Sequence, residues 1–138
     1  MNTLPTDRLA RAWALKAECY AAWHTEPTRA GDMAAALHAL EAEDPANTEL
    51  QALAAWTAGI AALAAGELPA ADVALLRARD AFVAGGDEQH AAETQVPRMV
   101  ALAMAGRDAD ALACGEAALA RFLAAGDLRS AAKIEINL

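Results

Sequence analysis

His90 and Glu93 are the residues whose types and spacing come nearest to a metal site. They stand three residues apart, and on a helix that spacing puts two potential ligands on one face. A transition-metal site needs a third and usually a fourth ligand, and the sequence shows none beside them. We therefore expect a solvated helical face here, with neither a metal ion nor a cofactor.

Nucleophilic catalysis has equally little support. Cys19 and His24 are five residues apart, which separates their faces on a helix, and no third residue stands where it would orient the histidine. His38 stands alone. The segment Gly85-Gly86-Asp87 joins two helical patterns and does not follow a strand, so it is not typical of a phosphate-binding loop. The sequence predicts that the protein is not an enzyme.

The elements that would position these residues form a block that recurs after 40 residues. The block consists of Gly66, Ala71, Ala78, Phe82 and Ala84-Gly85-Gly86-Asp87, which return as Gly106, Ala111, Ala118, Phe122 and Ala124-Ala125-Gly126-Asp127. Repeats of this length, built from helix formers, indicate stacked helical hairpins. We expect an all-α solenoid of antiparallel hairpins, with a closed helical bundle as the alternative fold. A solenoid normally works by presenting a surface.

Turn residues divide the chain into about seven helices, the last of which is unpaired. The expected hairpins span about 6–43, 47–84 and 87–124, followed by a partial repeat over 127–138. We expect a break over 26–31 with Asp32 as the next N-cap, caps at Asn47 or Thr48 and at Asp87, and a kink at Pro97. Because Ile134 and Leu138 begin an apolar stripe with no further helix to cover it, we expect the chain to be a fragment of a longer protein.

Composition excludes several partners. The formal charge is −8 with no run of Lys or Arg, so nucleic acid is not expected to bind. The longest apolar stretch, Ala52 to Ala65, is too short to cross a bilayer, and the first residues do not show a basic n-region followed by an apolar h-region. Cys19 and Cys114 lie far apart, which predicts buried free thiols in a reducing compartment. We expect no membrane partner and a cytoplasmic location.

The small residues of the recurring block resemble the tetratricopeptide repeat family. Gly59, Gly66, Ala71 and Ala78 stand at the spacing of that family's small positions, as do Gly106, Ala111 and Ala118, while Gly31 and Ala36 match more loosely. The resemblance covers about residues 17–138 and ends with Asn137-Leu138. The sequence departs from the family pattern in its period, which exceeds the usual length of about 34 residues. It also lacks the bulky aromatic residue expected early in the first helix of the third repeat, where Gln95 and Arg98 stand instead. Later segments are similar to bacterial arrays that precede CHAT peptidase domains or belong to multidomain regulators.

The resemblance implies a concave face lined by the first helix of each hairpin, on which family members hold extended peptides. The residues that it places there are Trp56, Ile60, Glu93, Val96, Val100, Met104, Lys133 and Asn137. The alternative for Trp56 is a position in the core between neighbouring helices. Only Lys133 and Asn137 are available to grip a terminal carboxylate, so an apolar or backbone-directed ligand is expected, including another domain of the same parent chain.

Two functions follow as hypotheses. The first is a non-catalytic protein–protein interaction module that docks a peptide or neighbouring domain in a partly apolar groove. The alternative is a structural segment that self-associates through its terminal helices into a homo-oligomer, since end repeats normally need a polar outer face.

Overall fold

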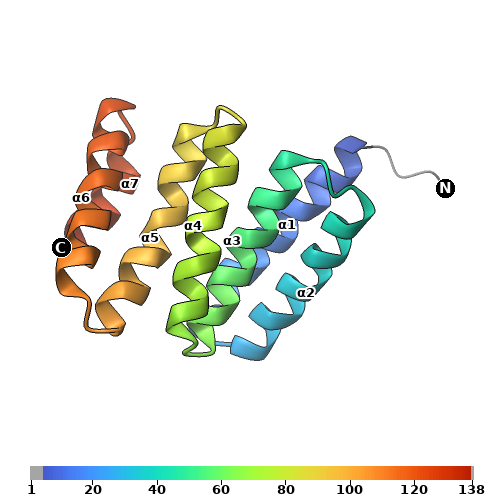
Figure 1. Ribbon diagram of the computed structural model, residues 1–138, viewed down its shortest axis with the longest axis horizontal. Helices are drawn as coiled ribbons and strands as arrows, with labels where there is room; N and C mark the ends of the chain where they lie inside the picture. The colour runs from blue at the N-terminus through green and yellow to red at the C-terminus, as the bar shows by residue number, and fades with distance from the viewer. Residues whose placement is uncertain (1–4, 138) are drawn as a thin grey trace.

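The computed structural model describes residues 5–137, with side chains described for residues 7–135. These residues form seven α-helices and no strand. Figure 1 shows the helices side by side along the long axis of the molecule, with the first hairpin and α7 at opposite ends. The helices are α1 (Pro5–Ala22), α2 (Pro27–Glu43), α3 (Thr48–Ala64), α4 (Leu68–Ala84), α5 (Glu88–Met104), α6 (Asp108–Ala124) and α7 (Leu128–Asn137).

Helices α3 to α6 are copies of one structural unit. Each has 17 residues, and after each comes a glycine with φ between 73° and 78°, at positions 66, 86, 106 and 126. The residue after this glycine donates its N–H to a carbonyl five residues earlier, as Asp87 does to Phe82 at 2.8 Å. This pattern is the Schellman end, which satisfies carbonyls that a helix otherwise leaves unpaired. The 40-residue recurrence is therefore two 20-residue helical units.

Side-chain caps begin three of the helices. Asn47 accepts a hydrogen bond from the Leu50 N–H at 3.0 Å, and Asp87 accepts one from the His90 N–H at the same distance. Asp127 caps α7 in the same way through the Ser130 N–H at 3.1 Å. The predicted caps Asn47 and Asp87 are thus confirmed, and each cap satisfies an amide at a helix start.

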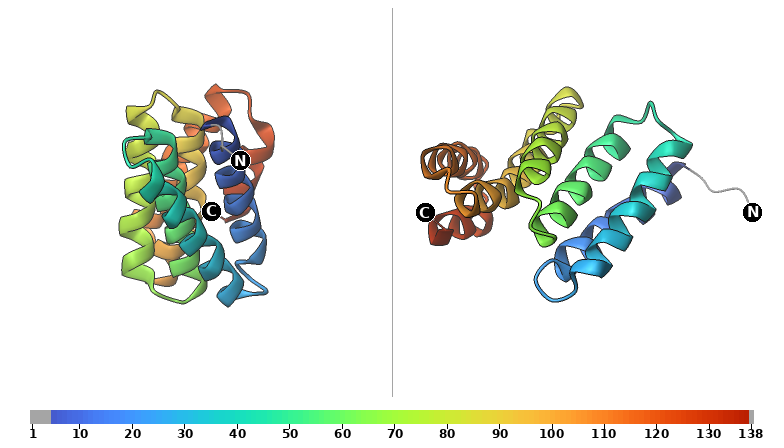
Figure 2. Two further views of the ribbon diagram at one scale, coloured as in Figure 1. Left: turned by 90° about the vertical axis from the view of Figure 1, so that its right-hand side faces the viewer. Right: turned by 60° about the horizontal axis from the view of Figure 1, so that its bottom comes forward.

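The helices stack in two layers. Each helix packs on its neighbours in the chain, and α1, α3, α5 and α7 also contact one another in succession, whereas α2, α4 and α6 do not. We call the first set the inner layer and the second the outer layer. Figure 2 shows this stacking from two further directions. Buried apolar side chains form three separate clusters along the stack, not one central core. The predicted all-α solenoid of antiparallel hairpins is confirmed, and the closed bundle is wrong.

Small side chains bring the two layers together. Ala71 and Ala78 of α4 are completely buried. Gly59 of α3 faces α4 where a Cβ atom would lie 2.5 Å from Cγ of Leu75. Ala111 and Ala118 are buried at the matching positions of α6. Because side-chain volume sets the distance between helix axes, these residues explain why the hairpins pack closely, as the sequence predicted.

Two local predictions need correction. Helix α2 begins at Pro27 and not at Asp32, because proline suits the first helical turn, where its missing N–H costs nothing. Ile134 is not an uncovered start of an apolar stripe, since it is fully buried in a cluster with Phe122 of α6. Leu138 lies outside the described residues. Helix α5 continues without a break through the buried Pro97.

Cys19 and Cys114 are free and buried, as predicted. Among the described residues, none of the helices combines the length and apolar character that crossing a bilayer requires.

Candidate functional site

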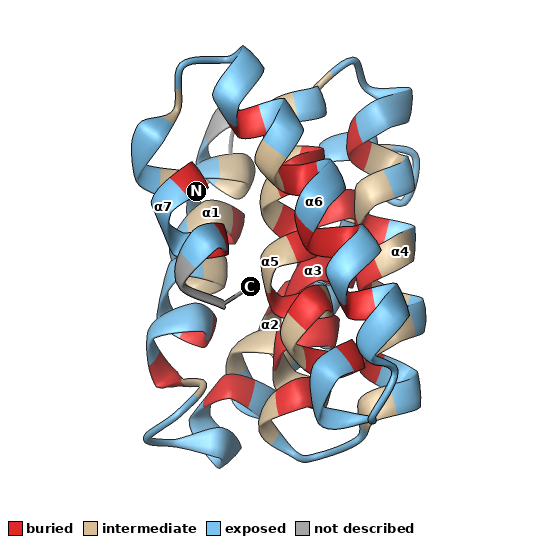
Figure 3. Cartoon of the chain, turned by 90° about the vertical axis from the view of Figure 1, so that its left-hand side faces the viewer, coloured by how far each residue is buried: buried red, intermediate tan, exposed pale blue. Residues whose placement is uncertain are grey.

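A hollow of about 270 Å³ lies on the inner layer, and all four helices of that layer contribute to it. Figure 3 shows α1 and α7 on one side of the molecule, away from α4 and α6, with buried residues concentrated between the layers. We call this site the inner hollow. Its lining residues are Lys16, Ala17, Tyr20, Trp56, Glu93, Val96, Ser130 and Lys133.

The floor of the inner hollow is aromatic and firmly packed. Trp56 is only 2% exposed, and its ring meets Trp13 and Phe82 edge-on at centroid distances of 6.3 and 5.6 Å. Such edge-to-face pairs are favourable beyond the area that they bury. Trp13 is held in turn by a hydrogen bond of 2.7 Å from its Nε1 to Glu49. A ligand in the inner hollow would therefore meet a rigid apolar surface.

Lysines and one glutamate surround that floor. Nζ of Lys16 lies 3.8 Å from the centroid of the Trp56 ring, a cation–π contact, and 5.5 Å from that of Tyr20. Burial lowers the pKa of Lys16, and Lys133 also lowers it, while Glu93 acts in the opposite direction. Burial, assisted by Glu93, raises the pKa of the Tyr20 phenol. The inner hollow thus combines an apolar floor with charges of both signs.

The structure brings together four of the eight residues that the sequence assigned to a groove: Trp56, Glu93, Val96 and Lys133. Trp56 is a core residue whose side chain also lines the hollow.

The other four predicted residues do not line the inner hollow. Ile60 is completely buried in the core, and Val100 packs on a separate cluster that contains Leu63 and Ala101. Met104 is 60% exposed beyond the hollow. The side chain of Asn137 lies outside the described residues. Helical spacing places residues on a face, but it does not tell how far along the helix the hollow extends.

The lining residues that sequence reasoning missed are Lys16, Ala17, Tyr20 and Ser130. Three of them belong to α1, which lies outside the clear recurrence. A usable signal existed, because α1 is the first helix of its hairpin and Lys16 and Tyr20 stand one helical turn apart.

His90 serves a structural role in this arrangement. Its Nδ1 lies 2.6 Å from Oδ2 of Asp87, its Nε2 lies 3.5 Å from Oε2 of Glu93, and its ring packs on Trp13 at 4.7 Å. The contact with His90 counteracts the effect of burial and lowers the pKa of Asp87. In the described part of the chain, no three His, Cys, Asp or Glu side chains are grouped as a metal site would need.

Cys19 is likewise engaged in packing. Its thiol lies 3.4 Å from the carbonyl oxygen of Ala30 in α2, and burial raises its pKa to about 11. A thiol with so high a pKa is a poor nucleophile at neutral pH.

Comparisons with models of protein families, with curated proteins and with solved structures give no match to this chain.

Proposed function

We propose that the protein is a non-catalytic protein–protein interaction module of the tetratricopeptide type. Its ligand is an extended peptide, or a segment of a neighbouring domain, that lies in the inner hollow. The observation that carries the proposal is the joint lining of this hollow by α1, α3, α5 and α7. A site built from four neighbouring helices of the inner layer suits a ligand that runs across them.

The chemistry of the inner hollow favours a ligand with both apolar and polar groups. Tyr20, 36% exposed, and the partly buried Val96 offer apolar surface above the Trp56 floor. Lys16, Glu93 and Lys133 supply charges that would fix the orientation and register of a peptide.

The test is a selection of binding peptides from a random display library on the full chain. We expect Tyr20→Ala and Lys133→Glu each to weaken the selected peptides by about tenfold or more. The matched control is Met104→Ala, which removes an exposed apolar side chain outside the inner hollow. It is expected to leave the affinity for the selected peptides unchanged. Equal binding by all three variants would remove this site from consideration.

A structural role through self-association is the second candidate. Three leucines of the last two helices are strongly exposed: Leu112 at 47%, Leu123 at 50% and Leu128 at 70%. Exposed apolar side chains at the end of a helical stack could be covered by a second copy of the chain. Light scattering over a range of concentrations distinguishes the candidates, because a monomer at high concentration rules out this one and leaves the interaction module intact.

A further inference from the structure

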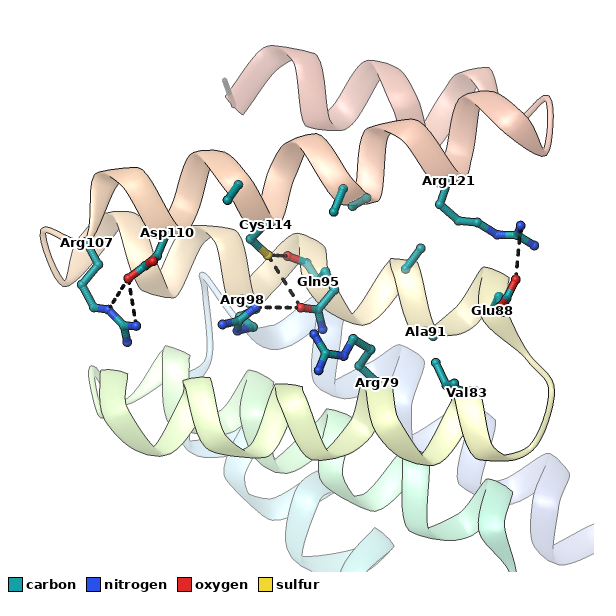
Figure 4. Close-up of a pocket in the computed structure, with 14 residues that line it drawn as sticks. Arg79, Val83, Glu88, Ala91, Gln95, Arg98, Arg107, Asp110, Cys114 and Arg121 are labelled. Carbon is teal, nitrogen blue, oxygen red and sulfur yellow. Dashed lines mark hydrogen bonds and ion pairs between the residues drawn. The ribbon is translucent and has the colours of Figure 1, made fainter.

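A second concave surface, the outer groove, lies between α4 and α6 and faces away from α1 and α7. Its volume is about 520 Å³, and α5 forms its floor with side chains that are mostly buried, among them Ala91, Ala92 and Gln95. Figure 4 shows the groove with Arg98 and Arg79 near its middle and with Arg107 and Arg121 toward opposite ends. The lining residues are Arg79, Val83, Glu88, Ala91, Ala92, Gln95, Arg98, Arg107, Asp110, Ala113, Cys114, Ala117, Ala118 and Arg121.

The outer groove has room for a backbone because small residues make up most of one wall and part of the floor. Helices α4 and α6 do not contact each other, so the space between them opens directly onto α5. Ala91 and Ala92 form part of the floor, and Ala113 and Ala117 stand one turn apart on the α6 wall. Small side chains permit another helix to approach closely. Between Arg107 and Arg121 the wall is about 20 Å long at 1.5 Å per residue, the length of a helix of about four turns.

The side chains that line the outer groove are net basic, in contrast to the whole molecule. The chain has 11 basic and 19 acidic residues, yet four arginines and only two acidic residues line this groove. The equivalent space between α2 and α4 also contains alanines of the helix beneath it, but its charged residues differ. Arg77 is the one arginine among its described lining residues, and the acidic residues Glu41 and Glu67 also line it. Stacking of hairpins therefore produces the grooves, whereas the arginine cluster is specific to the one between α4 and α6.

Two of the four arginines are fixed by the protein itself. Nε of Arg98 donates to Oδ1 of Asp72 at 2.6 Å, and Arg107 donates to Oδ2 of the same carboxylate at 3.0 Å. Arg98 also donates to Oε1 of the buried Gln95 at 3.1 Å. Although burial alone would raise it, these arginines hold the pKa of Asp72 below its ordinary value.

The other two arginines are held only at the surface. Arg79 pairs with the adjacent Asp80, and Arg121 lies 3.4 Å from Glu88; their side chains are 41% and 42% exposed. Exposed pairs of this kind contribute little and exchange readily. Arg79 and Arg121 are therefore positioned to form ion pairs with an incoming ligand.

We propose that the outer groove docks an acidic amphipathic helix of a partner protein. The helix lays an alanine- or leucine-rich stripe on the exposed Ala113 and Ala117 of α6, while its flanking carboxylates meet Arg79 and Arg121. A groove of this shape suits a helix in the manner of other helix-in-groove complexes. Nucleic acid suits it less, because Glu88 and Asp110 stand at its rim and the net charge of −8 repels phosphate.

The test is a display library of helical peptides of about 14 residues, selected on the full chain. The disrupting variant is Arg79→Glu with Arg121→Glu, and the control is Arg77→Glu, which reverses an arginine of the same helix in the other groove. We expect enriched peptides to carry Asp or Glu beside an apolar stripe and to bind the double variant about tenfold more weakly. Their affinity for the Arg77→Glu variant is expected to be unchanged, and salt is expected to weaken binding.

A library that gives no binder, peptides without acidic enrichment, or equal binding by the double variant would overturn the proposal. So would tighter binding of a short DNA duplex than of the peptides. Melting curves check the fold, and Arg79→Ala with Arg121→Ala replaces the double variant if charge reversal unfolds it. Lys133→Glu in the inner hollow is expected to leave the affinity for these helical peptides unchanged. The two proposals can therefore fail independently, because each is tested by variants of a different surface.

Discussion

Gly59 of α3 lies so close to Leu75 of α4 that a Cβ atom on it would come within 2.5 Å of Leu75 Cγ. Leu75 itself is fully buried. Helices α3 and α4 have the most extensive contact of any two helices in the described chain, and the absence of a methyl group at Gly59 permits their close approach at this point.

Gly59→Ala is therefore expected to destabilise the fold by about 1–2 kcal/mol, because overpacking exceeds the gain in helix propensity. Gly31→Ala is the matched control, since Gly31 is also helical and its added Cβ meets no atom within 4 Å. It is expected to stabilise by about 0.5–1 kcal/mol. Urea unfolding followed by circular dichroism measures both, and changes of the same sign would contradict the packing argument.

Adjacent glycines at one joint give a second test. Gly86 has φ of 78°, whereas Gly85 has φ of −85° and only ordinary contacts around an added Cβ. Gly86→Ala is expected to cost about 1 kcal/mol from left-handed strain. Gly85→Ala is expected to stay within about 0.5 kcal/mol of the parent chain. Thermal melts compare the two directly, and equal losses would show that the joint does not depend on backbone handedness.

Asp72 links stability to pH. Its folded pKa is lowered, so the ionised carboxylate stabilises the fold above its unfolded pKa of about 3.9, and this contribution is lost as the pH falls through the folded value. Asp72→Asn is expected to cost about 1–2 kcal/mol at neutral pH, with a loss that shrinks in acid. Asp80→Asn, in an exposed pair with Arg79, is expected to cost less than about 0.5 kcal/mol. Denaturant melts at several pH values measure this, and a pH-independent loss would disprove the link.

The cysteines report opening of the stack. Burial raises the pKa of Cys19 to about 11 and also raises that of Cys114. A thiol reagent such as DTNB is therefore expected to react with neither at pH 8 until the chain opens, and both are expected to react quickly in denaturant. Rapid labelling of the native protein would contradict the burial of these side chains.

The fold was largely predictable because its determinants are local. Glycines with a left-handed backbone, N-caps such as Asn47 and Asp87, and small residues such as Ala71 each leave a recognisable mark in a short window of sequence. The start of α2 was missed for the same reason. Pro27 and Gly31 suggest a break when read locally, yet proline fits a first turn and packing on α1 and α3 supports the rest.

The site was predictable only in part because it depends on how helices from different hairpins pack against one another. The spacing of Trp56, Val96 and Lys133 predicted that they share a face, and all three line the inner hollow. It did not show that α1 comes near enough for Lys16 to cover Trp56, since this contact joins residues 40 positions apart in different hairpins. The outer groove was missed because alanines and scattered arginines carry no signal until the fold places α4 and α6 on either side of α5.

The uniform joints also bear on how such a protein can change in size. Each is closed by bonds between residues of its own turn, such as Arg107 N–H to the Leu102 carbonyl at 2.9 Å. A segment that is copied between two glycines 40 residues apart, such as Gly66 and Gly106, contains a complete hairpin. Both of its ends are joints of the same type, so it can be inserted at another joint. Duplication of such a segment would lengthen the array by one hairpin, and each added hairpin would present new surfaces on which binding specificity can evolve.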